Sequence, residues 1–159
     1  MNIDIVAVGK IKESYLTSGI KEYQKRLSPY CTLRIIEVAE EKAPEYLSDK
    51  DKAQVLEREG SNILKKISPT SFVIPLCIEG QALSSEEMAE KLKNLMLKGR
   101  SHITFVIGGS LGLSDEVKAR GELSLSFSRF TFPHQLMRLI LLEQIYRWFK
   151  IIRGEPYHK

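Results

Sequence analysis

Apolar and polar positions alternate along the chain in blocks whose spacing switches between a strand period and a helix period. Short apolar runs rich in Ile and Val predict strands at residues 3–8, 33–38, 71–78, 103–107 and 123–127. Apolar positions three or four residues apart predict helices at residues 13–27, 48–67, 84–98 and 134–152, with a short one after Ser114. Strands that alternate with helices are typical of a mostly parallel sheet with helices on both faces. The predicted fold class is therefore α/β.

Proline and charged residues interrupt the middle of this pattern. Pro75 lies inside the strand predicted at 71–78 and cannot donate to a sheet ladder, which favours an edge strand or a kink. Residues 79–81, Glu-Gly-Gln, are expected to form a turn. The highly charged segment 39–47 contains Pro44 and is expected to be a solvated loop.

The length and charge of the chain narrow its class. With 159 residues and no linker or internal repeat, we expect a single domain over residues 1–159. No cleavable leader pattern precedes the first strand, and no apolar run reaches the roughly 18 residues of a membrane span, so we expect a cytoplasmic protein without a membrane segment. The net charge of +4 favours a polyanionic partner without requiring one.

Cysteine and histidine residues are too scattered to predict a metal site. Cys31 and Cys77 lie on predicted strands, and free thiols are favoured over a disulfide in a cytoplasmic chain. His102, His134 and His158 have no neighbours at the spacing of zinc ligands. We therefore expect no metal.

The glycine-rich segment 108–112, Gly-Gly-Ser-Leu-Gly, follows a predicted strand and precedes a short helix. It matches the G-x-S-x-G pattern of serine hydrolases, and Asp115 and His134 follow Ser110 in the order of that triad. The chain is short for such an enzyme, and Asp115 fits N-terminal helix capping or dipole stabilisation instead. The spacing of a dinucleotide site is absent. A serine hydrolase and a ligand-free tight turn remain open beside a ligand-binding loop.

Three segments meet at the carboxyl ends of the predicted strands, at residues 76–78, 108–112 and 127–132. Ligands of open α/β sheets bind at such an edge, and glycine lets the backbone approach a flat ligand closely. The sequence therefore predicts a pocket for a small molecule there.

The last helix and the tail suggest partners. The helix predicted at 134–152 is apolar around most of its circumference, which favours a homodimer contact, with a helix buried centrally in one chain as the alternative. Glu143 and Arg147 lie four residues apart, which predicts an ion pair on the helix surface. In the alternative interpretation, Arg147 binds a phosphate or carboxylate of a ligand. The tail at residues 157–159, Tyr-His-Lys, favours RNA as a partner. A tyrosine ring can stack on an unpaired base, a histidine titrates near neutral pH and a lysine can contact phosphate. An RNA-binding protein without enzymatic activity is thus a further alternative.

Taken jointly, these motifs closely resemble the RlmH family. The matching segments span the chain: residues 5–10, 108–112, 125–135 and 153–159. The resemblance implies a SPOUT-class methyltransferase with a C-terminal trefoil knot that works as a homodimer. It also implies S-adenosyl-L-methionine as methyl donor and N3 of a pseudouridine in 23S ribosomal RNA, within the assembled ribosome, as acceptor.

By motif position, the resemblance also implies the cofactor-binding residues. They are Leu76, Gly108, Phe127, Ser128, Arg129, Phe130, Thr131 and Phe132. It further implies a functional tail and an arginine on the substrate side.

The chemistry of methyl transfer to an imide nitrogen then suggests roles near the tail. N3 must lose its proton, and His158 is the candidate base, with Arg147 as the candidate group that stabilises the anion or a phosphate. Glu143 orients Arg147 or acts as the base itself, and Tyr157 stacks on the target base. Methyl transfer to nitrogen needs no metal ion as Lewis acid, because the leaving group is a neutral thioether. We hypothesise that one subunit's tail completes the other's cofactor pocket.

Overall fold

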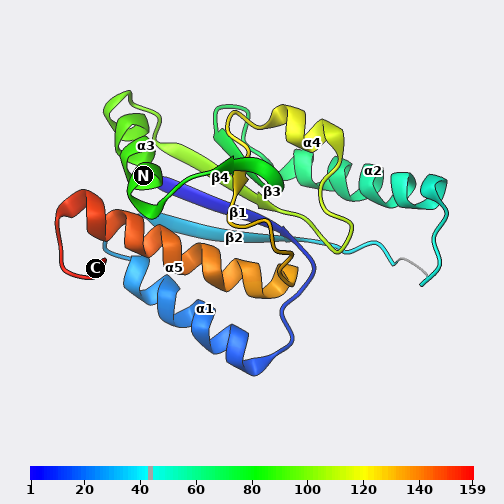
Figure 1. Ribbon diagram of the computed structural model, residues 1–159, viewed down its shortest axis with the longest axis horizontal. Coiled ribbons are helices and arrows are strands. Elements are labelled where there is room, and N and C mark those ends of the chain that lie inside the picture. Colours follow the sequence, from blue (N-terminus) through cyan, green and yellow to red (C-terminus); the bar gives the residue numbers. More distant parts are fainter. Residues whose placement is uncertain (43–44) are drawn as a thin grey trace.

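A computed structural model describes residues 1–42 and 45–159, and its elements alternate along the chain as the sequence predicts (Figure 1). The strands are β1 (Asn2–Val8), β2 (Thr32–Val38), β3 (Phe72–Ala82), β4 (His102–Ile107) and β5 (Leu125–Ser126). The helices are α1 (Ser14–Leu27), α2 (Asp49–Lys66), α3 (Ser85–Leu97), α4 (Asp115–Arg120) and α5 (His134–Arg153). All paired strands are parallel, in the order β2-β1-β4-β3-β5, which confirms the predicted α/β class.

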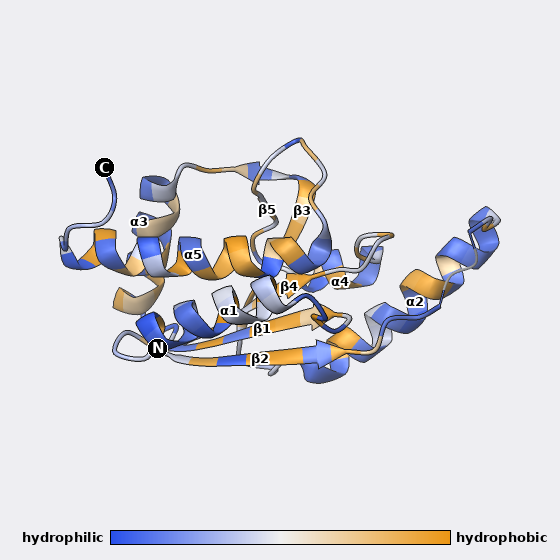
Figure 2. Ribbon diagram, turned by 90° about the horizontal axis from the view of Figure 1, so that it is seen from below, coloured by the Kyte–Doolittle hydropathy of each residue, from blue (hydrophilic) through white to orange (hydrophobic). Residues whose placement is uncertain are grey.

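Helices cover both faces of the sheet because successive strand residues point to opposite sides. In β1, Ile3 and Ile5 belong to the core formed with α1, α3 and α5, whereas Val6 and Val8 belong to the core formed with α2 and α4. Figure 2 shows the strands coloured largely as hydrophobic and the helices as a mixture of hydrophilic and hydrophobic residues.

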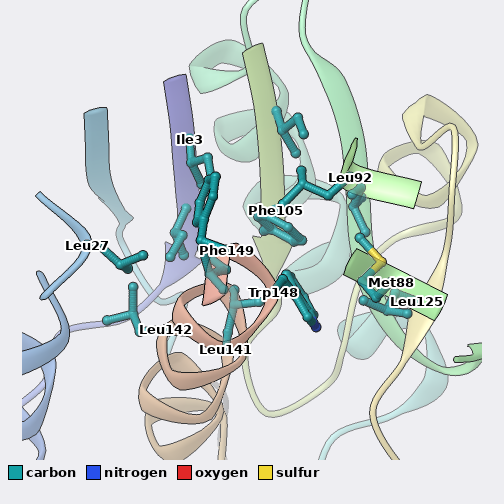
Figure 3. Packing of buried hydrophobic residues seen from close by; sticks show 14 of the residues in the cluster. Ile3, Leu27, Met88, Leu92, Phe105, Leu125, Leu141, Leu142, Trp148 and Phe149 are labelled. Atoms are coloured by element: carbon teal, nitrogen blue, oxygen red, sulfur yellow. The ribbon is translucent and has the colours of Figure 1, made fainter. Parts of the chain in front are cut away.

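Helix α5 packs against α1 and α3 on the first of these faces. Its side chains Leu141, Leu142, Trp148 and Phe149 are buried, and the indole of Trp148 lies 5.9 Å from the ring of Phe105 on β4 (Figure 3). This packing buries much of the apolar surface of α5 within one chain. It agrees with the alternative interpretation of the sequence, a helix buried centrally in the monomer. The homodimer stays a prediction.

Strands β3 and β5 differ from the predicted boundaries. Residues 79–81 do not form a turn, because β3 runs through them and the N–H of Gln81 donates to the carbonyl of Ser124 at 2.8 Å. The pairing with β3 involves only two strand residues of β5, so β5 is shorter than predicted. The pairing of β3 with β4 ends at Pro75, and the pairing with β5 lies beyond it. The proline therefore marks a change of partner strand.

The connection between β2 and α2 includes the loop predicted at 39–47. Residues 43–44, with Pro44, lie outside the described residues, and the other positions of this segment are neither helix nor strand. The loop leads to Ser48, whose hydroxyl accepts the N–H of Asp51 at 3.1 Å and so caps α2. None of the helices within residues 1–42 and 45–159 is long and apolar enough to cross a membrane.

Candidate functional site

A cavity of about 740 Å³ opens beyond the carboxyl end of β4, beside β3 and the segment after β5. Seven of the eight residues predicted to bind a cofactor line it: Leu76, Gly108, Phe127, Ser128, Phe130, Thr131 and Phe132. Arg129 is exposed and is not part of the lining. The cavity, which we call the large cavity, occupies the edge where open α/β sheets bind ligands.

The glycine loop forms one wall of the large cavity through its backbone. A Cβ atom on Gly108 would lie only 2.7 Å from the carbonyl carbon of Gly112. The loop can therefore close this tightly only with glycine at position 108. Gly112 has a φ of 84°, in the left-handed region, and its N–H donates to the carbonyl of Gly109 at 3.0 Å. The shape of this wall therefore depends on glycine at specific positions.

The segment after β5 forms a second, aromatic wall. The hydroxyl of Ser128 accepts the N–H of Phe130 at 2.9 Å, which holds the chain in a tight bend. The ring of Phe130 is 80% exposed at the cavity, whereas Phe127 packs edge-on against the buried Trp148 with ring centroids 6.5 Å apart. An exposed aromatic ring beside a cavity is typical of a binding surface.

One ion pair lies on the lining of the large cavity. Lys118 of α4 donates to the carboxylate of Glu79 on β3. This hydrogen bond raises the pKa of Lys118 and lowers the pKa of Glu79. The remaining lining is mostly apolar or backbone, a combination found in sites for small organic ligands.

The geometry does not assemble a serine-hydrolase triad. Nε2 of His134 has no hydrogen-bond partner among the described residues, so it accepts no hydrogen bond from the hydroxyl of Ser110. Asp115 lies in the first turn of α4, where the hydroxyl of Ser114 caps the helix by accepting the N–H of Val117 at 3.3 Å. Asp115 thus occupies the position of helix-dipole stabilisation that the sequence offered as the alternative.

The four residues predicted to act in catalysis lie together, two on the carboxyl-terminal part of α5 from its middle onward and two in the tail that follows it. Glu143 Oε1 accepts hydrogen bonds from Nε and Nη2 of Arg147, at 3.0 and 2.5 Å, and from the hydroxyl of Tyr157 at 3.1 Å. Nη1 of Arg147 donates to Nδ1 of His158 at 3.1 Å. The guanidinium also lies over the ring of Tyr157, 4.8 Å from its centroid. We call Glu143, Arg147, Tyr157 and His158 the tail network.

Both ring nitrogens of His158 are engaged in hydrogen bonds. Because Nδ1 accepts from Arg147, the neutral ring carries its proton on Nε2, which donates to Oε1 of Glu86 at 2.7 Å. Glu86 lies in the first turn of α3, and this hydrogen bond lowers the pKa of its carboxyl group. The lone pair on Nδ1 therefore becomes accessible to a substrate only after Arg147 moves away.

The surroundings of Tyr157 and Arg147 fix their protonation. Burial raises the pKa of Tyr157, and hydrogen bonds with Tyr23 and Glu143 raise it further. The hydrogen bond to Glu143 raises the pKa of Arg147. Near neutral pH, Tyr157 is thus a hydrogen-bond donor rather than a base, and Arg147 is a permanent cation.

Helix α5 lines the large cavity with its first turn, through His134 and Met137, whereas the tail network begins at Glu143 in the middle of the helix. His134, in the first turn, lines the cavity, and Arg147 follows 13 residues later, which corresponds to about 20 Å along a helix axis. A smaller cavity of about 260 Å³ adjoins the large one, shares three lining residues with it and extends to Gln144. Within one chain, no member of the tail network lines the large cavity.

Sequence reasoning does not find Glu86 or Tyr23 as members of the site. Glu86 contacts His158 from 72 positions earlier, and Tyr23 contacts Tyr157 from 134 positions earlier. Helix or strand periodicity cannot connect such distant positions. The only available signal is chemical, since a tail with a histidine and a tyrosine needs acceptors and donors from elsewhere in the chain.

The fold and the site together define an α/β domain with a small-ligand cavity at its strand ends. Residues 1–158 match the model of the family described as predicted SPOUT methyltransferase, and the chain belongs to this family. The activity is therefore that of a methyltransferase, and the serine hydrolase and the RNA-binding protein without activity are set aside.

Relatives of high identity cover the whole chain. A protein of Carboxydothermus hydrogenoformans named ribosomal RNA large subunit methyltransferase H is 63% identical over 159 residues, 100% of both chains. Proteins with the same name from Clostridioides difficile and Bacillus pumilus are 60% and 58% identical over the same length, again 100% of both chains.

Solved structures of lower identity share the fold. A probable methylase family protein from Haemophilus influenzae has a TM-score of 0.54 at 16% identity, with 99% of this chain and 70% of that chain covered. A probable methyltransferase from Bordetella pertussis has a TM-score of 0.56 at 9% identity, with 92% and 95% covered. At such identities the likeness concerns the fold alone.

Proposed function

We propose that the chain transfers a methyl group from S-adenosyl-L-methionine to N3 of a pseudouridine in 23S ribosomal RNA of the assembled ribosome. The observation that carries the RNA substrate is the 63% identity over the full length to a protein named ribosomal RNA large subunit methyltransferase H. The net charge of +4 supports a polyanionic partner. The motifs shared with the RlmH family support the nucleotide and the atom. Because ribosomes are the proposed substrate, the proposed location is the cytoplasm.

The large cavity fits this cofactor in size and chemistry. Its volume of about 740 Å³ lies within the roughly 300–1,000 Å³ of small-molecule sites. Gly108 leaves backbone groups accessible, Leu76 and Phe127 offer apolar contacts for a flat heterocycle, and Ser128 and Thr131 offer hydroxyls. We propose that these residues hold the cofactor. Arg129, which does not line the cavity, has the least support among the predicted positions.

Bound in this cavity, the cofactor would supply an electrophilic methyl group, so the chain has to position N3 and accept its proton. Arg147 is proposed to stabilise the imide anion or an adjacent phosphate, and His158 to act as base. These groups are paired with each other in the free chain, so substrate has to replace internal partners. Glu143, the shared acceptor, orients Arg147. Tyr157, whose ring contacts Arg147 and Tyr146 in the free chain, is proposed to stack on the target base after substrate replaces Arg147.

We further propose a homodimer in which the tail network of one subunit completes the large cavity of the other. The lining of the large cavity supports this arrangement, because it includes no member of the tail network of the same chain. Antiparallel α5 helices related by a twofold axis would bring the end of one helix to the start of the other. The C-terminal trefoil knot, which the family resemblance implies, belongs to the same proposal.

Calorimetric titration and a methylation assay test the proposed function. We expect saturable binding of S-adenosyl-L-methionine to the purified protein, and transfer of one labelled methyl group to N3 of a pseudouridine in ribosomes that lack the modification. Isolated small ribosomal subunits, which contain no 23S ribosomal RNA, serve as the control and should remain unlabelled. Absence of cofactor binding, or label on another nucleotide or atom, would contradict the proposal.

A further inference from the structure

Tyr23 on α1 reaches the tail network from a distant part of the chain. Its hydroxyl lies 3.4 Å from the hydroxyl of Tyr157, 134 positions later in the sequence. The contact is partly buried and bridges the helix at the start of the chain and the tail at its end.

The donors in this contact can be assigned from the neighbouring bonds. Glu143 can only accept when ionised, so the hydroxyl proton of Tyr157 points to its Oε1, 3.1 Å away. The oxygen of Tyr157 then accepts the hydroxyl proton of Tyr23. The result is a directed chain of hydrogen bonds from Tyr23 through Tyr157 to Glu143, whose Oε1 also receives the guanidinium of Arg147.

The ring of Tyr23 is itself fixed by its neighbours. The guanidinium of Arg26, one turn further along α1, lies 5.1 Å from the centroid of the Tyr23 ring. The ring of Tyr146 on α5 meets Tyr23 at 6.1 Å with an angle of 61°, and meets Tyr157 at 4.8 Å with an angle of 82°. Tyr146 thus packs edge-on against both phenols, so Tyr23 holds a defined position relative to the tail.

We propose that Tyr23 is a positioning residue for methyl transfer, an inference that rests on the proposed function. Its hydroxyl fixes Tyr157, and Tyr157 in turn holds the carboxylate of Glu143 that orients Arg147. Tyr23 acts through these side chains. Its loss therefore lowers the rate of the chemical step without changing how the cofactor binds.

The test compares Tyr23→Phe with Tyr15→Phe in the full-length protein. Both changes remove one hydroxyl from α1, and Tyr15 is 68% exposed, which makes it a matched control. We expect Tyr23→Phe to lower kcat on unmethylated ribosomes about threefold to tenfold, the usual effect of one lost hydrogen bond, with unchanged KM for S-adenosyl-L-methionine and unchanged melting temperature. Tyr15→Phe should leave all three quantities at the wild-type values.

A double-mutant cycle with Tyr157→Phe separates positioning from a general structural role. If Tyr23 acts through the Tyr157 hydroxyl, Tyr23→Phe should have no further effect on kcat once that hydroxyl is absent. Additive losses, or equal kcat values for Tyr23→Phe and wild type, would overturn the inference while leaving the proposed function intact.

Amide hydrogen exchange provides a readout that does not need activity. Residues 154–159 should exchange faster in Tyr23→Phe than in Tyr15→Phe, while the strands exchange alike. Equal exchange of the tail in the two variants would also contradict the inference. If the wild-type protein transfers no methyl group at all, the proposed function fails, and the role of Tyr23 in catalysis fails with it.

Discussion

The large cavity and the tail network differ in the groups from which they are built. Backbone atoms, glycines and aromatic rings shape the cavity, and its form depends on positions where no side chain fits, such as Gly108. The tail network consists of charged and hydroxylated side chains that satisfy one another, with Glu143 as the shared acceptor. Under the proposed function, the first region would bind its ligand without rearrangement, whereas the second would exchange partners when substrate binds.

Because of this difference, substitutions in the large cavity and in the tail network should affect different quantities, cofactor affinity for the first and turnover for the second. A change in the backbone-lined cavity should alter ligand affinity and folding together, because the loop packs against itself. A change in the tail network should lower turnover, because its side chains are the ones proposed to act on the substrate.

The largest effect is expected from Gly108→Ala. The added Cβ would meet the backbone of Gly112, which cannot move aside as a side chain would, so the loop must open. We expect cofactor affinity to fall about 100-fold, equivalent to about 2.7 kcal/mol, and the melting temperature to drop. Gly112→Ala is the comparison, because its Cβ meets nothing within 4 Å and only the positive φ causes strain. Calorimetry showing equal affinity losses for both variants would contradict this account of the loop.

Arg147→Met tests the tail network, and it should lower turnover. Removing the cation takes away the group proposed to stabilise the anion, so we expect kcat to fall about 100-fold. Cofactor affinity measured by calorimetry should stay within about twofold of the wild type, because Arg147 is proposed to act on the imide anion or a phosphate of the substrate and not on the cofactor. Arg153→Met, on the same helix with half of the Arg153 side chain exposed, serves as the control and should keep its kcat. Equal losses of kcat in the two variants would contradict the role of Arg147.

The sequence predicts the two regions unequally well. The parallel sheet and the three segments around the large cavity follow from periodicity and from the known place of ligands in such folds. The pairing of Glu143 with Arg147 follows from their spacing on one helix. The strand through residues 79–81 escapes prediction because Glu-Gly-Gln has turn chemistry, and only its pairing with the β5 segment makes it extended. The contacts of Tyr23 and Glu86 with the tail depend on tertiary packing that no local pattern encodes.

A third cluster, formed by Asp4, Arg34 and His102, is also built from paired charges but lies outside both regions. Its substitution is expected to have the smallest effect on turnover, which makes it a comparison for the tail network. Asp4 on β1 accepts two hydrogen bonds from Arg34, at 2.8 and 2.7 Å, and lies 2.8 Å from Nε2 of His102. Burial alone would raise the pKa of Asp4, but the hydrogen bonds from Arg34 and His102 outweigh burial and lower it. The stabilisation is therefore complete above the ordinary value of 3.8 and is lost as the pH falls through the lower folded value.

Asp4→Asn should thus reduce stability and leave the reaction intact. We expect a loss of about 1.5–3 kcal/mol in the free energy of unfolding at pH 7, and a weaker dependence of stability on pH below 4 than in the wild type. Urea titrations at pH 7 and pH 3 measure both quantities. The kcat at pH 7 should not change, and a fall in kcat comparable to that of Arg147→Met would show that charge pairing alone does not distinguish the tail network.

The central claim is that the cofactor site and the reacting side chains work together across two subunits. Its most direct test is a mixed dimer of a Gly108→Ala chain, which keeps its tail, and a chain truncated before Tyr157, which keeps its cavity. At a cofactor concentration near the wild-type Kd, neither variant alone should methylate ribosomes appreciably, and the mixed dimer should regain activity at one of its two sites. An inactive mixed dimer, beside active wild-type dimers reconstituted in the same way, would contradict the claim.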